Sequence, residues 1–309
     1  MNPIAPTSPP APQSRAPRIT APDGPAHEWL ILPPATLQGA LVAMIWRDMR
    51  GLPCDDAQRL SHFPASPLLT LSWFPDSEVG LVQQTDQGPR WQPFGASVVI
   101  GGSQSRPTAS WSPSAGQGGV LCFTPEVARS LLGIDPATVQ DRFVPADAIL
   151  PPHHQPLCAA LLKVSAPHEL SAVLTEHLAA PWQALHGRQG SGASLRQIGR
   201  HWVERLAWQA MEWQRSRSPR QVERRIKAFS GRSLRDWQAL VRTEGAFFAA
   251  RDRHDAGQPF DWADLAATEG FADQAHLVRA SRRITGFTPG EFADRFLHDE
   301  SFWLYRLWV

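Results

Sequence analysis

The sequence has few of the features that mark secreted, membrane or zinc-binding proteins. Its 309 residues include three cysteines, Cys54, Cys122 and Cys158, which are far apart and form no CxxC pair. A disulfide framework or zinc site is therefore not expected, and a reducing compartment fits the composition. No stretch approaches the roughly 18 apolar residues of a membrane span. The first residues lack the basic and apolar regions of a secretory signal. We expect a cytoplasmic protein with no membrane partner.

Catalytic motifs are also missing. The sequence contains no Gly-rich phosphate loop, no GxSxG nucleophile elbow and no HExxH zinc helix. His153 and His154 are adjacent, but neighbouring side chains in an extended loop point apart, so a shared metal ion is disfavoured. We expect no catalytic residue, no metal, no cofactor and no enzymatic activity. An enzymatic N-terminal domain stays open as an alternative, which a cluster of perturbed pKa values in a closed pocket would favour.

Charge is unevenly distributed along the chain. The net charge is +1, but residues 196–242 hold 12 basic and 4 acidic side chains. Such a basic segment is typical of a surface that binds a polyanion, or of a solvated helix face. Charge alone does not decide between the two.

The N-terminal half shows the pattern of a small β-rich domain. Residues 1–25 are rich in Pro, Ala and Ser, which predicts a disordered tail. Between about Trp29 and Thr124, short apolar runs at 69–73, 79–84, 97–100 and 120–123 alternate with Gly- and Pro-rich loops. This pattern predicts a β-sandwich or barrel.

Helices are predicted after these strands. Thr124 and Pro125 form a helix start, Gly133 a stop, and Asp135-Pro136 a second start. We predict an α+β fold. It consists of a β-rich sensory or dimerisation domain with trailing helices over 26–186, a Gly-Ser linker over 187–192, an all-α domain over 193–296 and a helical extension over 297–309.

Residues 218–237 and 273–292 are two copies of one unit. Each copy begins with an N-cap residue, places apolar residues seven apart on one helix face and carries basic residues opposite. The matching pairs are Ser218 and Asp273, Val222 and Leu277, Arg224 and Arg279, Lys227 and Arg282, and Phe229 and Ile284.

A short amphipathic helix is predicted ahead of the second copy, over 261–268. The turn Glu269-Gly270-Phe271 follows, and then the repeated helix, which is the helix-turn-helix pattern. Residues 234–250 are predicted to form one long helix that joins the two units. The first unit has no Gly between 207 and 218, so we expect a longer, irregular turn there.

These residues carry a family resemblance. The segment GFADQAHLVRASRRITGFTPGEF, starting at Gly270, closely resembles the second helix-turn-helix of the AraC/XylS family of transcription regulators. The segment SPRQVERRIKAFSGRSLRDW, starting at Ser218, resembles the first recognition helix of that family and the chain that follows it. The match covers about residues 200–296, while FTPEVARSLLGI at 123–134 loosely resembles the family's β-rich sensory domains.

The resemblance implies a double helix-turn-helix that binds double-stranded DNA and regulates transcription. We expect the β-rich N-terminal domain to bind a small-molecule effector or to mediate self-association as a homodimer, and RNA polymerase to be a partner if the protein is an activator. A ligand-independent DNA-binding regulator is an alternative, which an N-terminal domain packed solid with side chains would favour.

The predicted DNA contacts follow from how a recognition helix enters the major groove, with its N-terminal part against the bases. Arginine pairs with guanine and glutamine with adenine. The candidates for reading bases, which match family positions that touch DNA, are Arg220, Gln221, Arg224, Gln274, His276 and Arg279. The candidates for phosphate contact are Arg225, Lys227, Arg282 and Arg283. Lys227 is equally suited to an ion pair with Glu223 one helical turn earlier.

Overall fold

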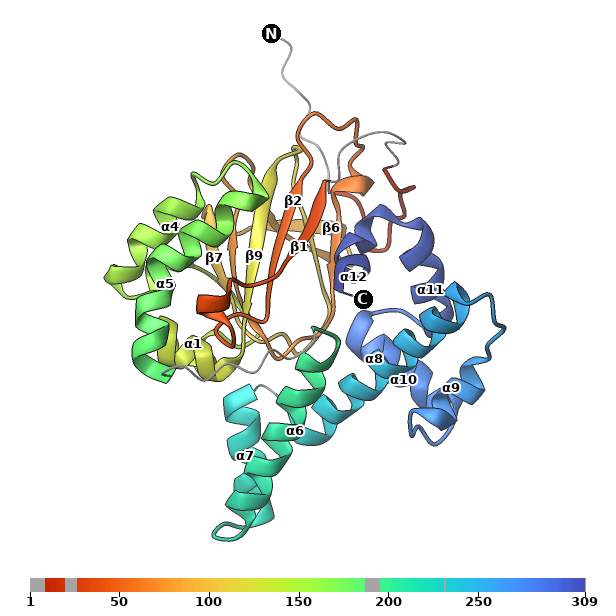
Figure 1. Cartoon of the computed structure of the whole chain (residues 1–309). Helices are drawn as coiled ribbons and strands as arrows, with labels where there is room; N and C mark the ends of the chain where they lie inside the picture. Colours follow the sequence, from red (N-terminus) through yellow and green to blue (C-terminus); the bar gives the residue numbers. More distant parts are fainter. Residues whose placement is uncertain (1–8, 20–26, 187–194, 231, 309) are drawn as a thin grey trace.

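The computed structural model describes the chain except residues 1–8, 20–26, 187–194, 231 and 309. It has an α+β fold, in which an N-terminal β domain is followed by a helical C-terminal region (Figure 1). The predicted linker at 187–192 lies outside the described residues. Among the helices that are described, none combines the length and hydropathy of a membrane span.

Two antiparallel sheets form the N-terminal domain. In the described part of the chain, the larger sheet has the order β1-β2-β9-β4-β7-β10 and the smaller β3-β8-β5-β6. The strands are β1 (Glu28–Ile31), β2 (Ala43–Asp48), β3 (Ser61–Phe63), β4 (Leu69–Trp73), β5 (Gly80–Thr85), β6 (Gly88–Pro93), β7 (Val98–Gly101), β8 (Thr108–Trp111), β9 (Gln117–Phe123) and β10 (Phe143–Pro145). The predicted α+β class is confirmed, and the four predicted runs correspond to β4, β5, β7 and β9.

Helices cover one face of the larger sheet, as Figure 1 shows. They are α1 (Pro125–Leu132), α2 (Pro136–Val139), α3 (Ala146–Ile149), α4 (Gln155–Leu161) and α5 (Leu170–His186). Trp46, Trp73 and Phe123 point from the sheet into this layer and are fully buried with the helices. The start of α1 is as predicted, because the Thr124 hydroxyl accepts from the Val127 amide and Gly133 ends the helix at φ +69°.

The C-terminal region contains two helix-turn-helix units built on one long helix. Its helices are α6 (Leu195–Gln214), α7 (Pro219–Ser230), α8 (Leu234–Asp255), α9 (Trp262–Thr268), α10 (Gln274–Thr285) and α11 (Pro289–His298), followed by the 3-10 turn η5 (Glu300–Phe302) and α12 (Trp303–Trp308). Helix α8 packs against α6, α7, α9 and α10. The long connecting helix predicted at 234–250 therefore exists and runs five residues further.

The two units share a core. Val222 and Ile226 of α7 are buried in one cluster with Leu240 of α8 and with Ile284, which belongs to the second unit's α10. Because one apolar cluster includes residues of both units, their relative placement is set by close packing.

The turn of the first unit differs from the prediction. Only residues 215–218 separate α6 from α7, and they form an ordinary hydrogen-bonded turn. The amide of Arg215 donates to the carbonyl of Glu212 and that of Ser216 to Trp213, at 3.2 and 3.3 Å. The expectation of a longer, irregular turn was wrong, because these bonds close the turn without a glycine.

The N-terminal segment also differs from the disordered tail predicted for residues 1–25. Residues 9–19 lie along α11 and η5, and Ala16 is buried. The carbonyls of Gln13 and Ser14 accept from the guanidinium of Arg295, which is itself buried. The segment contributes main-chain acceptors rather than apolar area, so composition alone did not indicate its order.

A glycine in β9 tests the packing between sheet and helices. A Cβ atom added at Gly119 would lie 2.2 Å from Trp73 Cζ2 and 2.8 Å from the carbonyl oxygen of Ile45. We expect Gly119→Ala to lower the free energy of unfolding by about 1–3 kcal/mol, because the close-packed core has no room for it. Urea denaturation measures this. Gly290→Ala is the control, since nothing lies within 4 Å of its added Cβ. Equal losses in the two variants would contradict the prediction.

Candidate nucleic-acid interface and interdomain cavity

Helix α7 presents one polar face to solvent. Val222 and Ile226 are buried against the neighbouring helices, which fixes the orientation of α7. Arg220 and Arg224 lie on the exposed side. At the start of the helix, the Ser218 amide donates to Gln221 Oε1 at 3.0 Å and the Gln221 amide to Ser218 Oγ at 3.4 Å. Gln221 is therefore both a base-reading candidate and half of a capping box.

Helix α10 repeats this arrangement in the second unit. Asp273 caps its start, with Oδ1 accepting from the His276 amide at 2.6 Å, and Gly286 ends it at φ +89°. Leu277 and Ile284 are buried, while Gln274 and Arg279 are exposed. The first turns of α7 and α10 thus present equivalent polar faces.

Among the base-reading candidates, His276 has the side chain that is most engaged in contacts within the protein. Its side chain is half-buried, and Nδ1 accepts from the Ala272 amide at 3.4 Å. The ring also meets Phe271 edge-on, with 5.3 Å between ring centroids. The histidine therefore stabilises the turn before α10, and only part of it faces solvent.

Three of the four phosphate candidates contact other side chains. Lys227 Nζ lies 2.8 Å from Glu223 Oε1, the pair that the sequence allowed. The Arg225 guanidinium lies 4.3 Å from the Trp213 ring centroid, and Arg283 Nη1 lies 2.9 Å from Asp236 Oδ1 on α8. Arg282 is exposed. These contacts are on the protein surface, where such pairs are weak and can exchange for a phosphate.

Helices α7 and α10 both reach the β domain with their C-terminal ends. The amide of Ala65, in the loop before β4, donates to the carbonyl of Ile284 at 2.8 Å. Helix α7 packs against α2, and the Arg129 guanidinium lies over the Phe229 ring at 5.5 Å. A movement of the β domain would therefore reach α7 and α10 directly.

A cavity of about 360 Å³ lies where the sheets and the C-terminal helices meet. Its β-domain lining includes small side chains on facing strands, such as Thr70, Ser72 and Ser110, which leave space between the sheets. Its other wall comes from α8, α11, α12 and the last turn of α10. An effector site was expected within the N-terminal domain alone, but this cavity is shared between both halves of the chain.

Three buried titratable groups at or beside the cavity are held in unreactive forms. Burial raises the pKa of the Cys122 thiol to about 12, and it also raises the pKa of the Tyr305 hydroxyl. His62, packed between the rings of Phe287 and Phe302, has its pKa lowered to about 3 by burial and by the charge of Arg295. Thiol and phenol stay protonated at neutral pH, so neither is prepared as a nucleophile or a base.

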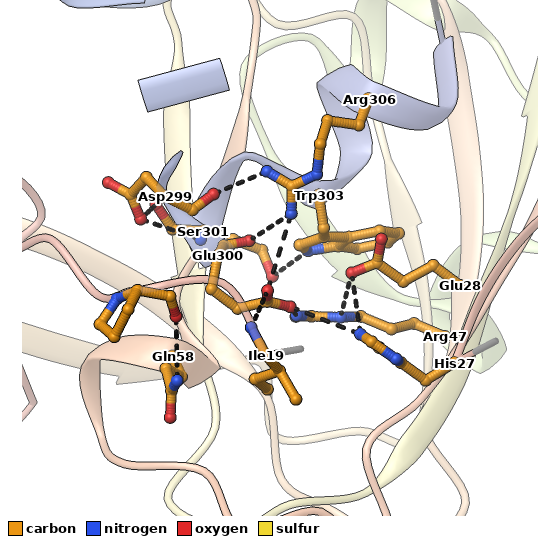
Figure 2. Close-up of polar contacts among 12 residues, drawn as sticks. Ile19, His27, Glu28, Arg47, Gln58, Asp299, Glu300, Ser301, Trp303 and Arg306 are labelled. Carbon is orange, nitrogen blue, oxygen red and sulfur yellow. Dashed lines mark hydrogen bonds and ion pairs between the residues drawn. The ribbon is translucent and has the colours of Figure 1, made fainter. Parts of the chain in front are cut away.

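A group of potential metal ligands lies beside the cavity. The ligand atoms of His27, Glu28 and Glu300 lie within 4.8 Å of one another. Figure 2 shows that the guanidinium of Arg47 enters this group, with Nη2 at 2.5 Å from Glu300 Oε1. A cation already occupies the position between the carboxylates, so the group is better described as an ion-pair network.

The adjacent histidines differ from the expected geometry. His153 and His154 lie in a 3-10 turn, not in an extended loop, and their rings are 4.2 Å apart. His154 Nε2 lies 3.1 Å from the carbonyl oxygen of Leu131. The rings do not point apart as predicted, because the turn is helical, but one ring nitrogen is already engaged.

Comparisons with known proteins give only a distant likeness. No family model matches the chain, and no curated protein matches its sequence. Solved structures of ToxT from Vibrio cholerae are similar to it. An apo ToxT is 12% identical, with a TM-score of 0.39, over 81% of this chain and 96% of the other. ToxT bound to an unsaturated fatty acid is 10% identical, with a TM-score of 0.35, over 76% and 93%. Likenesses of this size carry no argument about chemistry.

Sequence reasoning missed the C-terminal wall of the cavity and the ion-pair network. One signal for the network existed, because the charged Arg47 directly follows the apolar run from Leu41 to Trp46 within one strand. Glu300 likewise precedes the aromatic segment Phe302-Trp303. The pairing of two such distant segments could not be inferred from either one.

The double role of Gln221 gives a test. We expect Gln221→Glu to keep thermal stability, because a carboxylate can still accept from the Ser218 amide. Its affinity for a selected DNA site should fall by about 1–3 kcal/mol, because it cannot donate to adenine. Gln221→Ala, the control, should lose about 1 kcal/mol of stability as well. Binding of Gln221→Glu as tight as that of the wild type would show that Gln221 is a cap only.

Proposed function

We propose that this protein is a sequence-specific DNA-binding transcription regulator of the AraC/XylS kind, controlled by a small apolar effector in the interdomain cavity. The observation that carries the proposal is the repeated helix with an unengaged arginine at the same position. Arg224 and Arg279 are exposed, and neither has an ion-pair or hydrogen-bond partner among the described residues. An exposed guanidinium on the second turn of a recognition helix suits the O6 and N7 atoms of guanine.

The surrounding charge supports DNA as the partner. The basic excess in residues 196–242 covers α6, α7 and the start of α8. Arg225 and Arg282 flank the base-reading candidates on α7 and α10, where they suit phosphate contacts. Such contacts set the position of the protein on DNA and make its affinity depend on salt.

The cavity supports control by an effector. Its volume lies within the range of about 300–1,000 Å³ typical of small-molecule sites. Ile284 and Thr285 of α10 line it, so an occupant would touch the end of a recognition helix. A β domain packed solid would have favoured ligand-independent regulation. An apolar molecule suits the lining of this cavity. One ToxT structure holds an unsaturated fatty acid, whose chain is apolar, but our proposal of an apolar effector rests on the lining of this cavity alone.

The alternative of an enzymatic domain has less support. The perturbed groups at the cavity, Cys122 and Tyr305, have pKa values shifted away from reactivity. A DNA-binding role would place the protein in the cytoplasm. As an activator it would also contact RNA polymerase or a second copy of itself. Trp208 and Met211 on α6, 67% and 56% exposed, offer apolar area for a protein partner.

Selection from a pool of random DNA tests the central proposal. The full-length protein should enrich one sequence, and its affinity for that sequence should fall steeply as salt is raised. Enrichment of no sequence at low salt would reject sequence-specific binding.

Two arginines of α10 separate base reading from phosphate contact. We expect Arg279→Ala to cost about 1–3 kcal/mol on the selected site and to relax preference at one base pair. Arg283→Ala should weaken all sequences alike and reduce the salt slope by about one unit. Titrations on selected and scrambled DNA measure both effects. Equal losses for Arg279→Ala on the two DNAs would show that it contacts only the backbone.

Filling the cavity tests the effector site. Ser72→Phe adds a ring between the sheets, so it should reduce binding of the apolar fluorophore anilinonaphthalene sulfonate by about tenfold or more. Gln83→Phe is the control, because Gln83 is exposed on β5 outside the cavity. Fluorescence titration of the folded variants decides the matter. Unchanged binding in Ser72→Phe would place the fluorophore elsewhere.

A further inference from the structure

The end of the chain folds back onto the β domain. Residues 299–308, which we call the C-terminal latch, follow α11 and include η5 and α12. Helix α12 packs against β1 and β3, and Trp303 and Leu304 are buried with Ile45 and other residues of the larger sheet. Trp303 Nε1 donates to Ser61 Oγ at 2.8 Å. The second helix-turn-helix unit is thus anchored to the sheet by the segment that follows it.

One buried carboxylate joins the latch to the rest of the molecule. Glu300 is 1% exposed, and its oxygens meet Arg47 Nη2 of β2 at 2.5 Å and the backbone amide of Ile19 at 3.0 Å. Arg306 Nη2 of α12 lies 3.7 Å away. As Figure 2 shows, Glu300 joins the N-terminal segment, the sheet and the latch.

The network around Glu300 is incompletely paired. Glu28 Oε1, Arg47 Nε and Arg306 Nε are buried and have no hydrogen-bond partner among the described residues. The first two lie 3.5 Å apart, as an ion pair only. Buried charges stabilise a contact when their pairing is complete, and an incomplete network is weaker than an apolar contact. The attachment of the latch therefore depends on the charge of a few groups.

His27 is the member that titrates nearest to neutral pH. Its Nε2 lies 3.5 Å from Glu28 Oε1 and 3.7 Å from Glu300 Oε1. These two carboxylates raise the pKa of His27 to about 9, against the effect of burial. The other charged groups around it are Arg47 and Asp48 of β2, Arg306 of α12, and Arg18, which acts on Arg306.

We propose that residues 299–308 form a pH-dependent latch between the β domain and the second helix-turn-helix unit, closed while His27 is protonated and loosened when His27 loses its proton. The imidazolium attracts Glu28 on the sheet and Glu300 on the latch at once. When it loses its charge, this attraction is lost, and only Arg47 and Arg306 still pair with the two carboxylates. The consequence for DNA binding rests on the function proposed above, but the latch itself does not.

The direction of the pH dependence follows from the shifts. A pKa raised above 6.5 means that the stabilisation by His27 is complete below about pH 6.5 and is lost as pH rises through about 9. Burial alone would raise the pKa of Glu300, but its contact with His27 and the charge of Arg47 lower it to about 2. The contribution of Glu300 is thus lost only in strong acid. The latch should loosen between about pH 6.5 and 9.

Hydrogen exchange of the full-length protein between pH 6.5 and 9 tests the latch without DNA. After correction for intrinsic exchange, opening of residues 299–306 should increase about tenfold, since one pKa unit is a factor of ten. The expected increase is smaller than the full pKa shift of His27 would give. Part of that shift comes from Glu28, which lies on the same domain as His27 and stays beside it when the latch opens. His27→Gln should remove the pH dependence. At every pH, exchange of residues 299–306 in this variant should equal that of the wild type at high pH. His298→Gln is the matched control, since His298 is exposed and lies just before the latch.

Two outcomes of the comparison between pH 6.5 and 9 would overturn the proposal. One is a pH dependence in His27→Gln that parallels the wild type. The other is an equal increase of exchange in β4, which would mean global unfolding. Glu300→Gln, which keeps the size of the side chain, should open the latch at every pH, and unchanged exchange there would also count against it. Because His27 is only half-buried, His27→Gln keeps the test valid even if Glu300→Gln does not fold.

Discussion

Helix α8 packs into two apolar cores at once, one in each helix-turn-helix unit. The placement of both units depends on this helix. At one end Trp237 is fully buried, with its indole N–H donating to Ser230 Oγ at 2.8 Å, so the end of α7 is fixed on α8. Further along, Ala246 packs with Phe271 and Leu277 of the second unit. A rigid helix of 22 residues between two packed cores leaves little freedom for α7 to move relative to α10.

The contact between the β domain and the helical region has a different character. Besides the apolar packing of Trp303 and Leu304 on the larger sheet, it includes a cavity, a backbone bond from Ala65 to Ile284, and a buried network of opposite charges. Close-packed apolar surfaces permit little rearrangement of the elements that they join. A contact that contains a cavity and charges that depend on pH has more than one arrangement of similar free energy. Regulation is therefore better placed at this contact than inside the helix-turn-helix pair.

The sequence predicted what depends on local rules. Caps at Thr124, Gly133 and Asp273 and the alternating strand at 69–73 follow from neighbouring residues, and the structure contains them. The repeat predicted α7 and α10 because it aligns caps, apolar faces and arginines together. What could not be predicted depends on distant contacts. The order of residues 9–19 comes from the buried charge of Arg295, and the cavity comes from strands and helices that meet only in three dimensions.

The cavity lies between the shared core of the two units and their contact with the β domain. Ile284 belongs at once to the core shared by the two units, to the lining of the cavity and to the bond with Ala65. A molecule that filled the cavity would press on a residue whose neighbours on the other side are Val222 and Ile226 of α7. Because the shared core is close-packed, such pressure would displace the two recognition helices together relative to the β domain, rather than apart from each other. Under the function proposed above, the units would then act on DNA as one body, and an effector would change where that body lies.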